Sequence, residues 1–133
     1  MGIENWLSKR ILIADDLPNF RADLSRILKE LGFTNIKEAQ DGKAAWDELR
    51  LESQYGKPYD IIFSDINMPQ MNGLQLLKQL RAMESYKKIP IFIVSTENEK
   101  EIILKAIIDG ASDYIIKPYD AAIVKDKILK KLK

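Results

Sequence analysis

Short apolar runs and longer amphipathic stretches alternate five times along the 133 residues of the chain. The runs are continuous rather than alternating in polarity, which predicts strands buried on both faces. They cover residues 10–14, 35–39, 60–64, 89–94 and 112–116, of which 35–39 is the weakest. This order of elements predicts an α/β fold with a parallel sheet and helices on both faces. For five strands, the common doubly wound order is 2-1-3-4-5.

Helices are expected between the strands, because apolar residues recur there at helical spacing. Pro18 suits a first helical turn, and Gly32 ends the first helix. The expected helices cover residues 18–31, 43–52, 73–83, 99–108 and 120–132. The connection at 53–59 is expected to be the most flexible. Nothing in the sequence divides the chain, so we expect one domain over 1–133, with residues 1–9 as an N-terminal lead.

The chain contains neither cysteine nor histidine. Disulfides, thiolate catalysis and zinc–thiolate sites are therefore excluded, and any metal must be a hard cation held by oxygen. The 21 basic and 20 acidic residues give a formal charge of +1, which offers no argument for nucleic acid or a membrane surface. No apolar run is long enough to cross a bilayer. We expect a cytoplasmic protein that binds neither nucleic acid nor membrane.

Polar side chains follow the carboxyl ends of four predicted strands. Asp15 and Asp16 follow the first strand, Asp65 the third, Ser95 the fourth and Lys117 the fifth. Ligands bind beyond these ends where the strand order reverses, which here is between strands one and three. Three carboxylates in one crevice repel each other, and one lysine does not balance them. A divalent cation is therefore predicted, and Mg²⁺ suits a few oxygen ligands better than Ca²⁺ does.

The chemistry expected of this site is phosphoryl transfer to an aspartate. A carboxylate beside Mg²⁺ can attack a phosphoryl group and form an acyl phosphate, with Lys117 and Ser95 stabilising the charge. Each piece alone has an ordinary structural explanation, since an acid pair after a strand is often a helix N-cap. Their placement at four different strand ends favours a functional site. Because the chain has no histidine, any phosphohistidine donor must be another molecule.

The motifs around these residues resemble the response-regulator receiver family, and within it the single-domain chemotaxis regulators. The motifs are 13–16 (Ile-Ala-Asp-Asp), 64–69 (Ser-Asp-Ile-Asn-Met-Pro) with Gly73, 94–95 (Val-Ser) and 117–118 (Lys-Pro), with smaller matches at 28–33, 38–42 and 110–112. The resemblance runs from about residue 10 to the C-terminus. It implies a flavodoxin-like fold and a two-component signalling switch that receives its phosphoryl group from a sensor histidine kinase.

The resemblance also implies a metal site and a phosphoacceptor. Asp65 looks like the phosphoacceptor and one ligand of Mg²⁺. Asp16 would bind the ion directly, and Asp15 would act mainly through water. The backbone carbonyl of Asn67 would complete the protein ligands.

Three further residues have roles that the resemblance implies. Ser95 would bond a phosphoryl oxygen, and Lys117 would pair with the phosphoryl charge. Tyr114 matches the family's aromatic switch residue, whose ring turns inward once the hydroxyl side chain moves toward the phosphate. The structural alternative for Tyr114 is a half-buried aromatic residue on an edge strand.

The lifetime of the phosphorylated state is tuned in this family by two positions, which here are Asn67 and Glu97. Their pairing matches the chemotaxis regulators and implies loss of the phosphoryl group in seconds to minutes. Thr96 departs from the usual small residue beside the phosphoryl pocket. Its bulk could narrow access for the donor or for water.

The expected output is binding to another protein, such as a flagellar motor switch protein. The responding surface in the family is the fourth helix, fifth strand and fifth helix. Its lysines here are Lys100, Lys105, Lys125, Lys127, Lys130 and Lys131. This basic face could attract an acidic partner, or it could simply be a solvated surface. A phosphorelay intermediate, or a receiver of another two-component pathway, is the close alternative.

Two other classes of protein use related chemistry or the same fold. An aspartyl-phosphate hydrolase of the haloacid-dehalogenase type usually has a second Asp two residues after its nucleophile, where this chain has Asn67. A flavin-binding module would need a phosphate-cradling loop after the first strand. The negative charges of Asp15 and Asp16 would repel the phosphate of a flavin.

Overall fold

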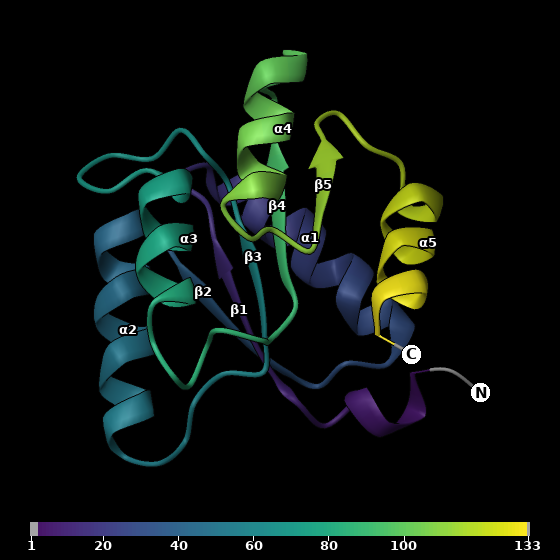
Figure 1. Cartoon of the computed structure of the whole chain (residues 1–133). Coiled ribbons are helices and arrows are strands. Elements are labelled where there is room, and N and C mark those ends of the chain that lie inside the picture. Colours follow the sequence, from purple (N-terminus) through teal and green to yellow (C-terminus); the bar gives the residue numbers. More distant parts are fainter. Residues whose placement is uncertain (1–2, 133) are drawn as a thin grey trace.

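Five strands form one parallel sheet in the computed structural model, which describes residues 3–132. The strands are β1 (Arg10–Ala14), β2 (Asn35–Ala39), β3 (Ile61–Ser64), β4 (Ile91–Ser95) and β5 (Asp113–Ile116). Their order is β2-β1-β3-β4-β5, which confirms the predicted fold class. All five carboxyl ends lie at the same edge of the sheet (Figure 1).

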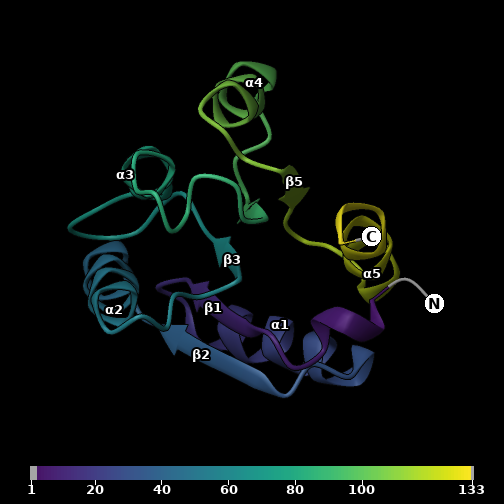
Figure 2. The same ribbon diagram turned by 60° about the horizontal axis from the view of Figure 1, so that its bottom comes forward.

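Helices cover both faces of the sheet. They are α1 (Pro18–Leu31), α2 (Gly42–Gln54), α3 (Gly73–Arg81), α4 (Lys100–Ile108) and α5 (Ala121–Lys131), preceded by a 3-10 turn, η1 (Glu4–Trp6). Figure 2 shows α1 and α5 on one side of the sheet and α2, α3 and α4 on the other. Within residues 3–132 no helix has the length and apolar character needed to cross a bilayer.

The core has two parts, one on each face, because successive strand residues point to opposite faces. On the side of α1 and α5, Phe63 and Phe92 stack with ring centroids 4.8 Å apart. Leu28 of α1 and Val124 of α5 belong to the same buried cluster. On the other side, Ile62 and its neighbours pack against α2, α3 and α4. Each helix is therefore held in place by its apolar stripe.

The element bounds differ from the prediction by one or two residues at several ends. β4 begins at Ile91 rather than 89, and Pro90, which lacks an N–H group, lies just before it. α5 begins at Ala121, since Asp120 is its N-cap and accepts a bond from the Ile123 N–H at 2.9 Å. α2 continues to Gln54, so the expected loop starts later than predicted.

The connection between α2 and β3 is anchored at its ends. The Arg10 guanidinium pairs with Glu52 at 2.9 Å and also donates to the Lys57 carbonyl. Asp60 accepts a bond from the Arg10 N–H at 2.9 Å. The Tyr59 ring is buried at the end of the connection. These contacts tie the sequence segment that we expect to be the most flexible to the amino end of β1.

Candidate functional site

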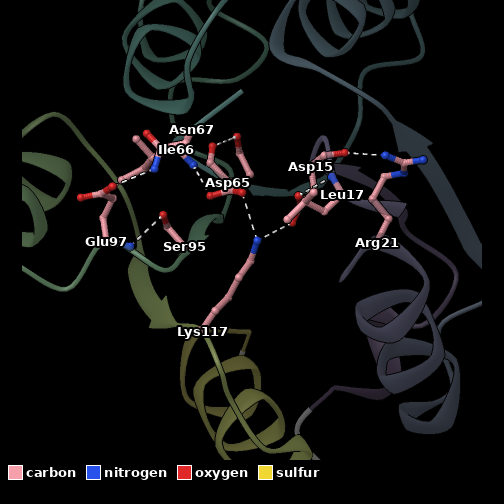
Figure 3. Close-up of polar contacts among 10 residues, drawn as sticks. Asp15, Leu17, Arg21, Asp65, Ile66, Asn67, Ser95, Glu97 and Lys117 are labelled. Atoms are coloured by element: carbon pink, nitrogen blue, oxygen red, sulfur yellow. Dashed lines mark hydrogen bonds and ion pairs between the residues drawn. The ribbon is translucent and has the colours of Figure 1, made fainter. Parts of the chain in front are cut away.

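Four strand ends bring polar side chains to one place at the carboxyl edge of the sheet. Asp15 follows β1, Asp65 follows β3, Ser95 ends β4 and Lys117 follows β5. Backbone hydrogen bonds continue the sheet past the strands. The Asp65 N–H donates to the Ala14 carbonyl at 2.9 Å, and the Lys117 N–H donates to the Ser95 carbonyl at 2.8 Å. The sheet itself therefore positions these side chains, as Figure 3 shows.

Three carboxylates gather at this point. Asp15, Asp16 and Asp65 each offer an oxygen, and these oxygens lie within 4.8 Å of one another. Asp15 and Asp65 are buried, with 4% and 6% of their surface exposed, whereas Asp16 is half-buried. The cluster is thus open to solvent on the side of Asp16.

The Lys117 ammonium lies between two of these acids. Its Nζ is 2.7 Å from Asp15 Oδ2 and 3.0 Å from Asp65 Oδ2. Only 1% of the Lys117 side chain is exposed, so the two ion pairs are shielded from water. Cations and anions in such a place interact much more strongly than on the surface. One ammonium nevertheless leaves an excess of negative charge among the three carboxylates.

Burial raises the pKa of Asp15 above its ordinary value. The hydrogen bond from Lys117 and the bond that Asp15 Oδ1 accepts from the Leu17 N–H at 3.0 Å oppose this rise without cancelling it. Asp65 adds to it through charge repulsion. The site therefore holds the charged form of Asp15 at an energetic cost, which a bound cation would offset.

The backbone around Asp65 is fixed by the start of α3. Asp65 Oδ1 accepts a bond from the Ile66 N–H at 2.7 Å, and the Gly73 N–H donates to the Ile66 carbonyl at 2.8 Å. A Cβ at Gly73 would lie 1.9 Å from the Asp65 carbonyl oxygen. Glycine is required here because the helix start touches the Asp65 backbone.

Residues from two loops meet beside the acids. The Asn67 amide donates to Glu97 Oε2 at 2.7 Å, so the two lifetime positions touch each other. Ser95 is fully buried, and its Oγ accepts a bond from the Glu97 N–H at 3.2 Å. Thr96, next to Ser95, is exposed. Figure 3 shows the Asn67–Glu97 pair on the opposite side of Asp65 from Asp15.

Tyr114 is buried in β5 rather than half-buried, with 5% of its surface exposed. Its hydroxyl donates to the Glu97 carbonyl at 2.6 Å. Burial raises its pKa. The ring therefore already lies inward and is bonded to the loop that follows Ser95.

The sequence reasoning missed two residues of the first helix. Arg21 donates to the Asp15 carbonyl at 2.6 Å and to Glu38 Oε1 at 3.3 Å, so it ties the end of β1 to β2. The Phe20 ring lies beside Lys117, with the Lys117 Nζ 4.1 Å from the ring centroid. In the sequence, Phe20 is one of the apolar residues at helical spacing within 18–31, which predicts only core packing. Both residues could have been identified from the sequence by their position in the first helical turn after the acid pair.

The donor set fits a hard divalent cation. All its side-chain ligands are carboxylate oxygens, which Mg²⁺ and Ca²⁺ prefer, and no thiolate or imidazole is present anywhere in the sequence. A buried carboxylate with a raised pKa is the condition that a bound cation relieves. The residues present therefore fit the predicted ion.

Known proteins resemble the chain over most of its length. A model of the response regulator receiver domain matches residues 11–129. The chain is 38% identical over 119 residues to chemotaxis protein CheY-3 of Vibrio cholerae, covering 90% of this chain and 88% of that protein. It is 37% identical over 121 residues to chemotaxis protein CheY of Pseudomonas aeruginosa, covering 91% and 94%.

Solved structures show the same fold. Vibrio cholerae CheY4 superimposes with a TM-score of 0.82 at 27% identity, covering 94% of this chain and 99% of that one. CheY in the CheX–CheY–BeF3–Mg²⁺ complex of Borrelia burgdorferi gives a TM-score of 0.85 at 26% identity, covering 98% and 93%. The chain therefore belongs to the response regulator receiver domain family, as its motifs predict, and is similar to the CheY-type chemotaxis regulators.

Proposed function

We propose that Asp65 accepts a phosphoryl group from a phosphohistidine on a separate sensor kinase and that this switches a protein-binding face. The observation that carries the proposal is the Lys117 ammonium, which is ion-paired with both Asp65 and Asp15 inside a cluster of three carboxylates. The family is a signalling receiver rather than an enzyme of metabolism. The chemistry we propose is limited to the chain's own phosphorylation and dephosphorylation, in the cytoplasm where the kinase presents its phosphohistidine.

The proposed reaction is an in-line displacement at phosphorus. An Asp65 carboxylate oxygen forms a bond to phosphorus, and the bond from phosphorus to the donor imidazole nitrogen breaks. The electron pair of that bond stays on the imidazole, which takes up a proton from solvent. Hydrolysis reverses the outcome, because water attacks phosphorus and Asp65 leaves as a carboxylate. The Lys117 ammonium stabilises the charge on the phosphoryl oxygens throughout.

The cation we propose is Mg²⁺, held by Asp15, Asp16, Asp65 and the backbone carbonyl of Asn67. When bound, the ion neutralises excess carboxylate charge and stabilises the transferring phosphoryl oxygens. The CheY relative from Borrelia burgdorferi is found with Mg²⁺ and BeF3.

The switch that we propose uses Ser95 and Tyr114. Ser95 Oγ, which now accepts a bond from the Glu97 N–H, would bond a phosphoryl oxygen instead. The loop after Ser95 would then move together with Tyr114, because the Tyr114 hydroxyl is bonded to the Glu97 carbonyl. Movement at Asp65 would thereby reach β5 and the helices beside it.

We propose a phosphoryl lifetime of seconds to minutes. The amide of Asn67 and the carboxylate of Glu97 lie next to Asp65, where they can orient an attacking water. Thr96, whose bulk could narrow the access of water, is exposed. The lifetime is measured by the decay of the phosphorylated mass after the donor is removed, and a species that survives overnight at neutral pH with Mg²⁺ contradicts it.

The output face is more apolar than the lysines of the sequence suggest. Four of these lysines are ion-paired: Lys105 with Asp109, Lys125 with Glu30, Lys127 with Asp113 and Lys130 with Asp126. Exposed apolar side chains lie between them, and these are Leu104, Ile107 and Ile108 of α4, Ile116 of β5 and Ile123 of α5. Ile108 has 72% of its surface exposed. The partner that fits this face is an output protein with an apolar docking segment.

The experiment that tests the proposal weighs the intact protein after incubation with acetyl phosphate. Wild type should gain one phosphate when Mg²⁺ is present and none when it is chelated, and Asp65→Asn should gain none. Asp126→Asn is the matched control, because Asp126 is an exposed acid on α5 and should leave labelling unchanged. Labelling of Asp65→Asn at the wild-type rate would refute the assignment of the acceptor.

Two further incubations separate the alternatives. If the phosphorylated chain binds a motor switch protein, the chemotaxis output is supported. If it passes its phosphoryl group to a histidine phosphotransfer protein, it is a phosphorelay intermediate. Multiple turnover on a simple phosphomonoester would indicate a hydrolase of the aspartyl-phosphate class, and we expect none.

A further inference from the structure

The Lys117 ammonium has three N–H donors and two carboxylate partners. Asp15 Oδ2 and Asp65 Oδ2 accept from it at 2.7 and 3.0 Å. Within residues 3–132 these are the hydrogen bonds recorded for Nζ, and the remaining contact is the Phe20 ring, whose centroid is 4.1 Å away. A cation at this distance from an aromatic ring is attracted by the ring's quadrupole, most strongly where water is excluded.

The first helical turn places the backbone of Phe20 so that its half-buried ring meets Lys117. Phe20 lies in the first turn of α1, directly after the acid pair, and its N–H donates to the Leu17 carbonyl at 3.1 Å. Leu17 is in turn bonded through its N–H to Asp15 Oδ1. The same short segment therefore positions one carboxylate and the aromatic ring that contact the ammonium.

We propose that Phe20 is a positioning residue for phosphoryl transfer and that its ring holds the Lys117 ammonium beside Asp65 through a cation–π contact. This inference rests on the proposed function. It assigns to Phe20 a role beyond core packing, in which the ring acts on the reaction through Lys117 and touches neither the donor nor the phosphoryl group.

The ring differs from the two carboxylates in what it does to the ammonium. A carboxylate holds the ammonium by neutralising it, whereas the neutral ring attracts the cation and leaves its net charge available to phosphoryl oxygens. Phosphorylation also turns one Asp65 oxygen into the O–P oxygen of an acyl phosphate, while the donor leaves with the electron pair of its broken bond. Asp15 is a proposed metal ligand. The Phe20 contact is chemically the same before and after transfer, whereas the Asp65 contact is not.

The test lowers the electron density on the face of the Phe20 ring and keeps the shape of the ring nearly unchanged. Phe20 is replaced in turn by 4-fluoro-, 3,5-difluoro- and 3,4,5-trifluorophenylalanine, and the rate of Asp65 labelling by acetyl phosphate is measured with Mg²⁺ present. We expect the logarithm of the rate to fall steadily with each fluorine, reaching about three- to tenfold slower with three. Phe20→Leu should be at least as slow. Thermal unfolding should show that the fluorinated proteins remain fully folded at the assay temperature.

A second aromatic residue provides the matched control. Phe33 is fully buried in the apolar cluster shared by α1 and α5, and within residues 3–132 no cation lies over its ring. The same three fluorinated residues at position 33 should leave the labelling rate unchanged. Equal slowing at positions 20 and 33, or no slowing at 20, would overturn the inference.

A readout without donor or metal separates this inference from the proposed function. The Lys117 side-chain protons next to Nζ should show an upfield ring-current shift in the NMR spectrum, which Phe20→Leu removes. If wild type is not labelled, the proposed function fails, whatever the NMR spectrum shows. If wild type is labelled and the fluorinated series has a flat rate, the proposed function survives and the role of Phe20 does not.

Discussion

Replacing Lys117 by Met removes the ammonium that is ion-paired with Asp15 and Asp65 and keeps most of the side chain's apolar stem. At an effective dielectric constant of about 20, the ion pairs at 2.7 and 3.0 Å contribute roughly 6 and 5.5 kcal/mol of Coulomb energy. The ammonium's own desolvation cost disappears with it and cancels several kcal/mol of this. What remains is two buried carboxylates without a partner, for which a loss of about 3–5 kcal/mol in the free energy of unfolding is expected.

Urea unfolding at pH 7 with a chelator measures this loss, and added Mg²⁺ makes the measurement diagnostic. In wild type, the ammonium would compete with the proposed Mg²⁺ for Asp15 and Asp65. Lys117→Met removes that competition, so the variant should bind Mg²⁺ more tightly and gain more unfolding free energy from the same Mg²⁺ concentration. A second substitution, Asp15→Asn, should restore part of the stability in the absence of metal, because one of the uncompensated charges is gone.

Lys125→Met is the matched control. The Lys125 Nζ is 3.7 Å from Glu30 Oε1 at the surface, where an ion pair contributes about 0–1 kcal/mol. Its unfolding should therefore resemble that of wild type with and without Mg²⁺. If Lys117→Met unfolds within about 1 kcal/mol of wild type and responds equally to Mg²⁺, the reasoning that Lys117 compensates the carboxylates is wrong.

Two further predictions concern the backbone at Asp65 and the buried tyrosines. Gly73→Ala should lower the free energy of unfolding by about 1–3 kcal/mol or more and slow labelling, because a Cβ would lie 1.9 Å from the Asp65 carbonyl oxygen; urea unfolding and intact mass measure both. Burial raises the pKa of Tyr59, Tyr86 and Tyr114, so the folded state favours their neutral form. The stability that they contribute is full below the ordinary tyrosine pKa of about 10 and is lost as the pH rises above it. In a Tyr55→Phe background, which removes a tyrosine that is 69% exposed, the ultraviolet tyrosinate signal should appear together with unfolding, and its appearance in the still-folded protein would contradict the prediction.

The fold could be predicted from the sequence because its strands are continuous apolar runs that stop abruptly. The run at 10–14 ends at Asp15, and the run at 60–64 ends at Asp65, so the positions of both acids follow from where the apolar run stops. Parallel pairing then brings the two ends together. Strand ends at which the sequence does not change from apolar to polar were predicted less well. Ile89 and Pro90 belong to the apolar run at 89–94 but lie outside β4.

The output face shows a different limit of sequence reasoning. Lysine positions were visible in the sequence, but ion pairs such as Lys127–Asp113 join residues of different elements, and their effect on surface charge needs the fold. The apolar residues Leu104 and Ile108 look like core positions on a helix as apolar as α4. Only the packed structure shows that Ala106 faces the core while these two face outward.

Phe20 shows why a periodic pattern does not reveal every residue of a site. Periodicity reports which face of a helix is apolar, and Phe20 satisfies it together with Leu24, Ile27 and Leu28. The first turn of α1 differs from the later turns, because it starts where the strand ends and the acids begin. An aromatic ring at that boundary can pack against the core with one edge and present its face to a buried cation. A residue that meets a core pattern directly beside a polar cluster therefore has two possible partners, and the position of Lys117 decides between them.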